Sequence, residues 1–380
     1  MKRLICLFLL LLLPFPALAD ELTSALDRLF PRYHTTGAVV AVARQGQIVF
    51  HYDYGYADKK QHLPVTEETY FKTASVTKLV SALGVMRLVE DGLLALEAPI
   101  GSYLGYDVVN PAHADIPIAL RHLMSHTSGI KGSYSSGRQL SALLASPSRW
   151  NTWAPGTRYA YSNLGAGIMG SLMEAVTGQD VNTCLREQVF APLSIDAGYR
   201  VHLLDHPEQA ALRYNSDGWL ARTADFYLTE PWDPRALPES HYDLTIGDLW
   251  IRGDDLCRLG MMLANNGCLD GVRILQTTTV DAMLHTVTGR SPYGLCVERV
   301  DTLVDGLLFY GHQGMSDGVL CNLYWEPKTQ FVFALITNGC DTRQDNRIAL
   351  LSRQAFAHAW ASYGTSYIPP EPSWLVTDEQ

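Results

Sequence analysis

Residues 78–90, together with Val76 just before them, constrain the fold of this 380-residue chain more than any other segment. They have the spacing of a helix, and they leave almost no polar face on it. A helix that is hydrophobic on all sides has to be buried in the core. Asp91-Gly92 supplies a stop signal directly after it. The sequence therefore predicts a buried helix with the apolar residues Val76, Leu79, Val80, Leu83, Val85, Met86, Leu88 and Val89.

Strand-like segments lie near both ends of the chain. Residues 38–43 and 48–54 flank a turn, and so do residues 319–325 and 331–337, which predicts two β-hairpins. Helical spacing is found in residues 78–90, 166–176, 181–190, 254–264 and 346–363. This order predicts an α+β fold, in which a mostly antiparallel sheet is flanked by terminal helices and joined to a helical lobe, with a cleft between them.

The composition is that of a folded globular protein, since 47% of the residues are hydrophobic and 18% are charged. With 39 acidic and 29 basic side chains, the formal net charge is -10. This charge argues against nucleic acid or an anionic membrane surface as the main partner. A small molecule or a short peptide is the predicted substrate, and the oligomeric state stays open.

Residues 1–19 are typical of a secretory signal peptide. Lys2 and Arg3 precede an apolar run, and Ala17-Leu18-Ala19 forms a cleavage site. The uncharged stretch 4–19 has 16 residues, fewer than the roughly 20 that a membrane-spanning helix needs. We therefore predict an exported, periplasmic protein without a transmembrane anchor after processing. Its catalytic domain is predicted to cover residues 20–364, and residues 365–380 to form a loosely ordered tail.

Six cysteines lie beyond this leader, and their spacing includes no C-x-x-C pair. The pattern predicts neither a zinc site nor a thioredoxin-like site. An exported protein can oxidise its cysteines, but six of them allow 15 connectivities, which the sequence does not resolve. We interpret them mostly as small buried apolar residues, namely Cys184, Cys257, Cys268, Cys296, Cys321 and Cys340.

Ser75 and Lys78 lie one turn apart at the start of the buried helix. The helix dipole and the loss of water both disfavour a charged ammonium there, which lowers the pKa of Lys78 and lets its amine take a proton from Ser75. The Ser75 N–H is among the unpaired donors at the helix start and can face a developing oxyanion. An S-x-x-K pair recurs by chance, so this hypothesis needs support from other motifs.

Two later segments supply that support. The hydroxyl of Tyr161 can relay the proton to a leaving group, and the amide of Asn163, two residues on, can bind a substrate amide. Gly314, before a predicted strand, lets a substrate backbone approach. The N–H of Met315 can complete an oxyanion pair with Ser75.

In this order the motifs resemble those of the serine β-lactamase and penicillin-binding-protein superfamily, specifically its class C-like branch, which also holds D-peptidases and esterases. The resemblance extends over residues 37–361 and implies a β-lactamase/transpeptidase-like fold with Ser75, Lys78 and Tyr161 as catalytic residues. The stretches that carry it are Ser75-Val76-Thr77-Lys78, Tyr161-Ser162-Asn163 and His312-Gln313-Gly314, supported by residues 122–129, 155–159, 254–256 and 271–275.

His312 departs from the pattern of that family. True β-lactamases and many transpeptidases carry a lysine at this place, which helps to hold the substrate carboxylate, whereas a histidine goes with peptidases, D-aminopeptidases and esterases. With an unperturbed pKa near 6.5, His312 is predicted to be mostly neutral at pH 7 and to offer the substrate a hydrogen bond more than a charge. Efficient penicillin hydrolysis is therefore disfavoured.

Three other motifs are interpreted as structural. Ser316 lies in a G-x-S-x-G match, but a strand follows it where a nucleophile elbow needs a helix. Residues 165–170 match the dinucleotide-binding motif G-x-G-x-x-G. We interpret these glycines as small residues that let a helix pack closely against Tyr161, and not as a dinucleotide site. His122 and His126 could share a helix face near the cleft, but they lack the glutamate of H-E-x-x-H.

The predicted reaction is a two-step acyl transfer that needs no metal and no organic cofactor. Three classes stay open for the substrate. The first is a peptidase or amidase acting on D-amino-acid or cell-wall peptides, the second is a carboxylesterase with the same nucleophile, and the third is a β-lactam-hydrolysing enzyme or a penicillin- or peptide-binding protein without turnover. The complete set of Ser75, Lys78 and Tyr161 speaks against binding alone. Specificity is expected to lie in loops such as residues 201–245.

Overall fold

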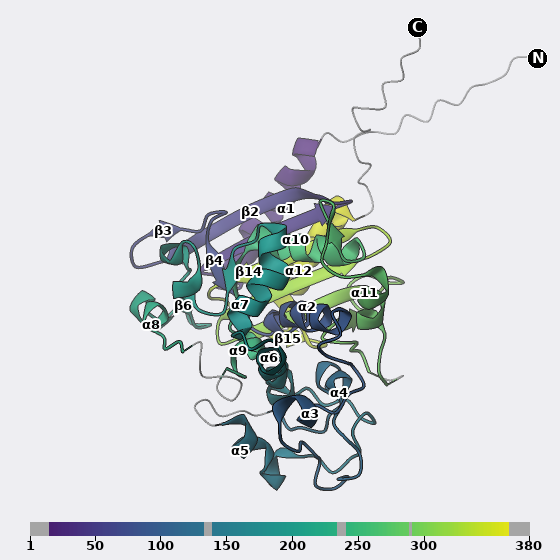
Figure 1. Ribbon diagram of the computed structural model, residues 1–380. Helices are drawn as coiled ribbons and strands as arrows, with labels where there is room; N and C mark the ends of the chain where they lie inside the picture. The colour runs from purple at the N-terminus through teal and green to yellow at the C-terminus, as the bar shows by residue number, and fades with distance from the viewer. Residues whose placement is uncertain (1–14, 133–138, 234–240, 289–290, 365–380) are drawn as a thin grey trace, which may run out of the picture.

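The computed structural model describes residues 15–132, 139–233, 241–288 and 291–364. Most of the predicted leader, Cys6 included, and the predicted tail 365–380 lie outside these ranges. Within them, seven strands form one antiparallel sheet in the order β11-β12-β13-β14-β1-β2-β3 (Figure 1). The strands are β1 (Gly37–Arg44), β2 (Gln47–Asp58), β3 (Leu63–Pro64), β11 (Glu298–Val300), β12 (Phe309–Ser316), β13 (Val319–Glu326) and β14 (Phe331–Thr337).

The pairing of β1 with β14 joins the two ends of the chain in one sheet. Both predicted hairpins are confirmed, because β1 pairs with β2 and β13 pairs with β14. All of β1 is buried. Its side chains alternate between two cores, with Val39 and Ala41 in one and Val40 and Val42 in the other. A strand whose side chains are all apolar from Ala38 to Ala43 therefore fits a sheet that is covered on both faces.

Helices from the two termini cover one face of this sheet (Figure 1). They are α1 (Phe15–Arg32) and α12 (Leu350–Tyr363). The prediction that the last helix begins at residue 346 is wrong by four residues. Asn346 and Arg347 have positive φ angles of 48° and 70°, which no helix accommodates, and they form the turn between two short strands. Those strands are β15 (Gln344–Asp345) and β16 (Ile348–Ala349).

The other face of the sheet packs against α10 (Gly253–Ala264) and α2 (Val76–Glu90). Beyond them lies the predicted helical lobe, at the bottom of Figure 1. Its helices include α3 (Gly101–Leu104), α4 (Leu120–Met124), α5 (Leu140–Leu144) and α6 (Asn163–Thr177), and α7 (Val181–Leu185) packs against α6 at the level of α2. The remaining helices are α8 (Ala224–Leu228), α9 (Leu244–Gly247), α11 (Thr277–Leu284), the π-helical turn η2 (Arg186–Phe190) and the 3-10 turns η1 (Pro147–Arg149), η3 (Ala191–Leu193), η4 (Val201–Leu203) and η5 (Pro207–Gln209).

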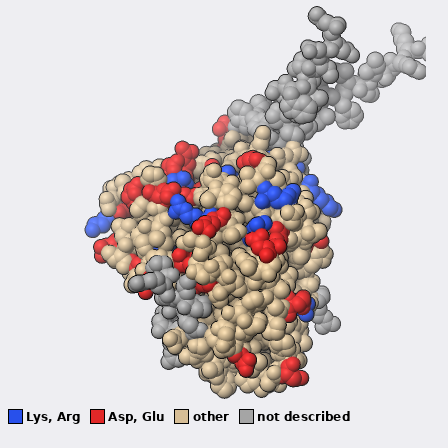
Figure 2. Space-filling view, in the orientation of Figure 1, with Lys and Arg blue, Asp and Glu red and all other residues tan. Residues whose placement is uncertain are grey.

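Several short strand pairs complete the described chain. Three strands, β4 (Tyr70–Lys72), β8 (Trp250–Arg252) and β5 (Ala197–Gly198), form a small sheet that leads into α2 and α10. The others are β6 (Arg213–Tyr214) with β7 (Leu220–Arg222), and β9 (Cys268–Leu269) with β10 (Val272–Arg273). Of the helices described, none is both long and apolar enough to span a bilayer. On the face shown in Figure 2, basic and acidic side chains are interspersed over the half that holds the sheet.

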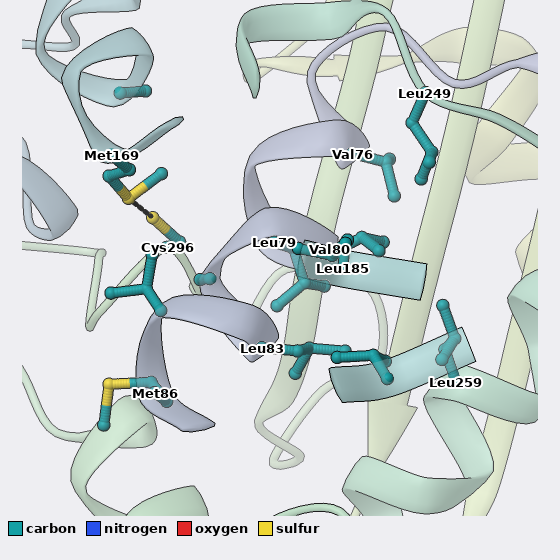
Figure 3. Packing of buried hydrophobic residues seen from close by; sticks show 14 of the residues in the cluster. Val76, Leu79, Val80, Leu83, Met86, Met169, Leu185, Leu249, Leu259 and Cys296 are labelled. Atoms are coloured by element: carbon teal, nitrogen blue, oxygen red, sulfur yellow. Dashed lines mark hydrogen bonds between the residues drawn. The ribbon is translucent and has the colours of Figure 1, made fainter. Parts of the chain in front are cut away.

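Helix α2 is buried as predicted, and it lies between the sheet and the lobe. Figure 3 shows its side chains meeting neighbours from both sides, with Leu185 and Met169 from the lobe and Leu259 from α10. Cys296 packs here as well, with its thiol 3.6 Å from the sulfur of Met169. All six described cysteines are free, and all but Cys268 are buried, which confirms their interpretation as apolar core residues.

Replacing a core side chain of α2 tests this arrangement. Leu83 is fully buried, whereas Leu93, just after the helix, is 47% exposed. We expect Leu83→Ala to lower the free energy of unfolding by about 2–5 kcal/mol, because the cavity it leaves is enclosed. Leu93→Ala should change it by less than about 0.5 kcal/mol. Urea unfolding measures both, and equal effects of the two substitutions would contradict the central place of α2.

Candidate active site

Ser75 stands at the N-terminus of α2, where the chain leaves β4. The residue before it, Ala74, has a φ angle of 45°, in the left-handed region that non-glycine residues rarely adopt. Ser75 itself is already helical, with φ -67° and ψ -10°, and its side chain does not cap the helix. The Ser75 hydroxyl is therefore presented at a tight turn and is not used by the backbone of the helix it precedes.

Lys78 reaches back to this hydroxyl from one turn further along α2. Its Nζ lies 2.9 Å from the Ser75 Oγ and donates to the carbonyl oxygen of Ile246 at 2.5 Å. The side chain is fully buried. Burial lowers the pKa of Lys78 to about 7, as the sequence analysis expects from its position. A large fraction of this amine is thus neutral near pH 7 and can accept a proton.

Tyr161 completes the group around Ser75. The Lys78 Nζ lies 5.3 Å from the centre of the Tyr161 ring. Burial of the hydroxyl raises the pKa of Tyr161, and hydrogen bonding with Ser75 opposes that rise. Although 37% of the residue is exposed, its ring packs 4.3 Å from the ring of His126, centre to centre. The structure therefore brings together the three side chains that the sequence proposes as catalytic.

Asn163 and Met315 line a pocket of about 300 Å³ that opens beside Ser75. Asn163 is the first residue of α6, and its buried Oδ1 has no hydrogen-bond partner within the described chain. The oxygen can therefore accept a hydrogen bond from a bound substrate. The rest of the wall is mostly polar, and it includes Lys72, Ala74, Arg213, Asp243, Ile246, Gly247, Asp248 and Ser316.

The charged residues of this pocket were not found by sequence motifs. Asp248 forms ion pairs with Lys72 at 2.7 Å and with Arg200 at 3.0 Å. Although burial raises the pKa of Asp248, the two cations lower it below its ordinary value. Two of the charged residues, Arg213 and Asp243, lie in segment 201–245, which is predicted to determine specificity. That prediction was the sequence signal for a role of these two residues in the pocket.

Strand β12 passes close to the start of α2, and Gly314 permits this approach. A Cβ atom at Gly314 would lie 2.3 Å from the carbonyl oxygen of Thr73 and 2.8 Å from the backbone nitrogen of Ser75. Such distances exclude any side chain at this position. Gly314 thus brings the strand against the protein's own backbone at the nucleophile. The prediction from the sequence instead assigns this glycine to the approach of a substrate backbone.

The direction of the Met315 N–H follows from the pairing of β12. This strand pairs with β11 only up to Gly311, and beyond that residue no strand among the described residues pairs with the same edge. On this edge the Gln313 N–H donates to a carboxylate oxygen of Glu298 at 3.2 Å. Edge groups repeat every second residue of an antiparallel strand. The Met315 N–H therefore points off the same edge, toward the pocket that it lines with Ser75.

His312 does not line this pocket. It is buried, its Nδ1–H donates to the carbonyl oxygen of Gln313 at 2.7 Å, and its Nε2 accepts from the hydroxyl of Tyr293 at 2.5 Å. Burial lowers the pKa of His312 to about 3, so the expectation of a pKa near 6.5 is wrong. The ring is neutral, as predicted, but both nitrogens are engaged by the protein. Its predicted hydrogen bond to a substrate is therefore replaced by one to the strand backbone.

The other motifs have structural roles. Ser316 ends β12 and is followed by β13, so no nucleophile elbow exists there. The glycines of residues 165–170 lie inside α6, where Gly167 and Gly170 pack against Tyr242 and Thr245. The expected packing against Tyr161 is therefore wrong, although close helix packing does explain the motif.

The two histidines of the lobe are buried and bound to the backbone. His122 Nδ1 accepts from the N–H of Ala119, and His126 Nδ1 accepts from the N–H of Ser162. They share no helix face, because α4 ends at Met124 and His126 has a φ angle of 55°. No group of three or more His, Cys, Asp or Glu within the described ranges is arranged to hold a metal ion.

A family model described as Beta-lactamase matches residues 18–356. The chain belongs to the beta-lactamase family. Penicillin-binding protein 4 of Amycolatopsis lactamdurans is 29% identical over 341 residues, which are 82% of this chain and 83% of that protein. Esterase EstB of Burkholderia gladioli is 31% identical over 223 residues, 52% of this chain and 55% of the esterase.

The fold of the beta-lactamase family is also found by comparing structures. A solved class C beta-lactamase superposes with a TM-score of 0.73 and 16% sequence identity, over 93% of this chain and 99% of that one. The predicted fold class and the predicted family are therefore confirmed. The chain is a serine hydrolase of the beta-lactamase family.

The pKa of Lys78 sets a pH dependence for this beta-lactamase-family enzyme. If the neutral amine is the base, kcat/KM for an uncharged substrate should rise as pH increases through about 7 and then level off. His312 should add no step between pH 5 and 8, since its pKa is about 3. The measurement is a pH profile from 5 to 9.

A control variant separates Lys78 from a second group that titrates in the same range. Burial raises the pKa of Glu298 to about 7. Glu298→Gln should keep the rise in kcat/KM and move it slightly to lower pH, because the negative charge that favours the ammonium form of Lys78 is removed. Loss of the rise in this variant would assign the titration to Glu298.

Gly314 offers a test of the oxyanion donors. We expect Gly314→Ala to lower kcat by about 100-fold or more, because the methyl group displaces β12 from the backbone of Ser75. Thermal unfolding of the variant checks that it remains folded. An unchanged kcat in a folded variant would mean that β12 supplies no donor to the reaction.

Proposed function

We propose that this protein is an exported serine hydrolase that cleaves amide bonds of short D-amino-acid or cell-wall-type peptides through an acyl-enzyme at Ser75. The observation that carries the proposal is the buried Lys78 amine at 2.9 Å from the Ser75 hydroxyl, with a pKa of about 7. A buried lysine that held no proton-transfer role would have little reason to face a serine hydroxyl in a dry site.

The proposed reaction has two steps. The Ser75 Oγ attacks the carbonyl carbon while its proton moves to Lys78, and Tyr161 passes a proton to the leaving amine. The N–H groups of Ser75 and Met315 stabilise the oxyanion. Water then hydrolyses the ester of Ser75 by the same route. Since Lys78 and Tyr161 lie against each other, they act as one proton-transfer unit, and neither is named as the sole base.

The polar pocket supports a peptide as the acyl part of the substrate. Asn163 offers a free oxygen to an amide N–H, and Lys72, Arg213, Asp243 and Asp248 surround the remaining space. A long apolar acyl chain would find few apolar contacts there. The resemblance to the branch that holds D-peptidases supports the same substrate class.

A carboxylesterase is the second candidate, and two observations favour it. The 31% identity to Esterase EstB covers about half of each chain. His312 is buried and neutral where true β-lactamases and many transpeptidases carry a lysine, so the strand offers no cation to a substrate carboxylate. The binding of an ester that has no carboxylate would not be weakened by the absence of this cation.

Export is proposed from residues 1–19, and the fold is compatible with their removal. Helix α1 runs through the predicted cleavage site after Ala19. Leu18 and Ala19 also pack against the core on this face of the sheet, but they are only partly buried, and the fully buried contacts of α1 are made by later residues, including Leu22, Leu26 and Phe30. Cleavage after Ala19 would therefore shorten α1 at one end and leave this packing in place.

A panel of substrates on the purified protein tests the proposed function. We expect D-alanyl-D-alanine peptides and D-amino-acid amides to be hydrolysed, and nitrocefin to be hydrolysed poorly. Turnover of p-nitrophenyl esters alone would favour the esterase. A fluorophosphonate probe should label Ser75, and Ser75→Ala should abolish both labelling and turnover in a folded protein. An adduct on Ser316 or Ser128 would overturn the assignment.

A further inference from the structure

Two side chains occupy the backbone groups of Gln313 on the edge of β12 that lies beyond its pairing with β11. The N–H of Gln313 donates to Glu298 at 3.2 Å, and its carbonyl oxygen accepts from His312 at 2.7 Å. An open strand edge would accept an added extended chain through these two backbone groups. Met315, the next residue with backbone groups on this edge, lines the Ser75 pocket. The edge is therefore available to a substrate at Met315 and occupied at Gln313.

Tyr161 indicates which part of a substrate faces Gln313. Its ring lies 6.4 Å from the ring of His312 and 6.5 Å from that of Tyr293, centre to centre. The pocket beside Ser75 extends the other way, toward Ser316 at the end of β12. A group that receives its proton from Tyr161 therefore departs on the Gln313 side. On that side the substrate carries its leaving group.

We propose that Glu298 and His312 form a cap on Gln313 that restricts the leaving group to about one residue. This inference rests on the proposed acyl-enzyme reaction at Ser75. Successive residues of a strand are about 3.3 Å apart, so Gln313 lies about 7 Å from Met315 along the edge. A second leaving-group residue in extended conformation would need the backbone groups of Gln313, which the cap already holds.

Both members of the cap are fixed by the fold. His312 is oriented by the Tyr293 hydroxyl on its other ring nitrogen. Glu298 is the first residue of β11, where it pairs with Gly311. On its far side Glu298 lines a separate cavity of about 200 Å³, together with Tyr159, Tyr293 and Arg347. Truncation of Glu298 would therefore free the Gln313 N–H and leave space for a longer leaving group.

The length of the leaving group is the quantity to vary. Two peptides share the acyl part N-acetyl-D-alanyl and differ in the leaving group, which is D-alanine amide in one and D-alanyl-glycyl-glycine amide in the other. We expect the natural protein to cleave the short peptide with at least tenfold higher kcat/KM. Glu298→Ala should reduce this preference tenfold or more. Glu298→Gln should retain it, because the amide oxygen of glutamine still accepts from Gln313.

A pair of phosphonate probes separates failure of the cap from failure of the proposed function. Both carry the same acyl-like arm, and their phenol leaving groups are either plain or extended by a glycyl-glycine amide. Attack by Ser75 forms the Oγ–P bond and releases the protonated phenol, and mass spectrometry gives the rate of labelling. No labelling of Ser75 by either probe would overturn the proposed function. Normal labelling with a ratio that Glu298→Ala leaves unchanged would overturn the cap alone.

Discussion

The burial of the Lys78 amine beside Ser75 is the constraint on which the rest of the structure depends. A charged ammonium without an ion-pair partner is costly in a dry interior, so the group loses its proton readily. Its dry surroundings come from α2, whose apolar residues pack against the sheet on one side and the lobe on the other. The sheet and the lobe thus do more than support the nucleophile. By burying Lys78, they also set the pKa of this neighbour of the nucleophile.

The second requirement of the site is that the backbone of β12 comes close to the backbone at the start of α2. Residues with little or no side chain make this approach possible. Gly314 allows β12 to touch the start of α2, and the left-handed turn at Ala74 directs Ser75 toward it. These contacts leave almost no free space between the two backbone segments. The reacting groups are therefore positioned by the packing of the backbone, which does not depend on flexible side chains.

The parts that could be predicted from the sequence are those encoded locally. The all-apolar α2, the two hairpins and the spacing of Ser75 and Lys78 follow from neighbouring residues, and the structure agrees with them. His312 was placed before a predicted strand, whereas it lies within β12. Its environment was not foreseen either, because Tyr293 meets it from a loop before β11. Glu298 gave no signal, since its contact with Gln313 depends on the register of β11 against β12. The start of α12 was missed for a similar reason, because the turn at Asn346 is tied down by the side chain of Gln313.

The histidine at position 312 changes what the strand can recognise. A lysine there would bring a second cation close to Lys78, and it would have no acceptor nitrogen for the Tyr293 hydroxyl. Neutral histidine has one donor and one acceptor, and Tyr293 and the Gln313 carbonyl use both. The exchange thus removes a charge from the substrate side and adds a hydrogen bond to the strand edge. With the proposed cap, the enzyme selects its leaving group by length and not by charge. His312 occupies the Gln313 carbonyl oxygen, and Glu298 occupies the Gln313 N–H.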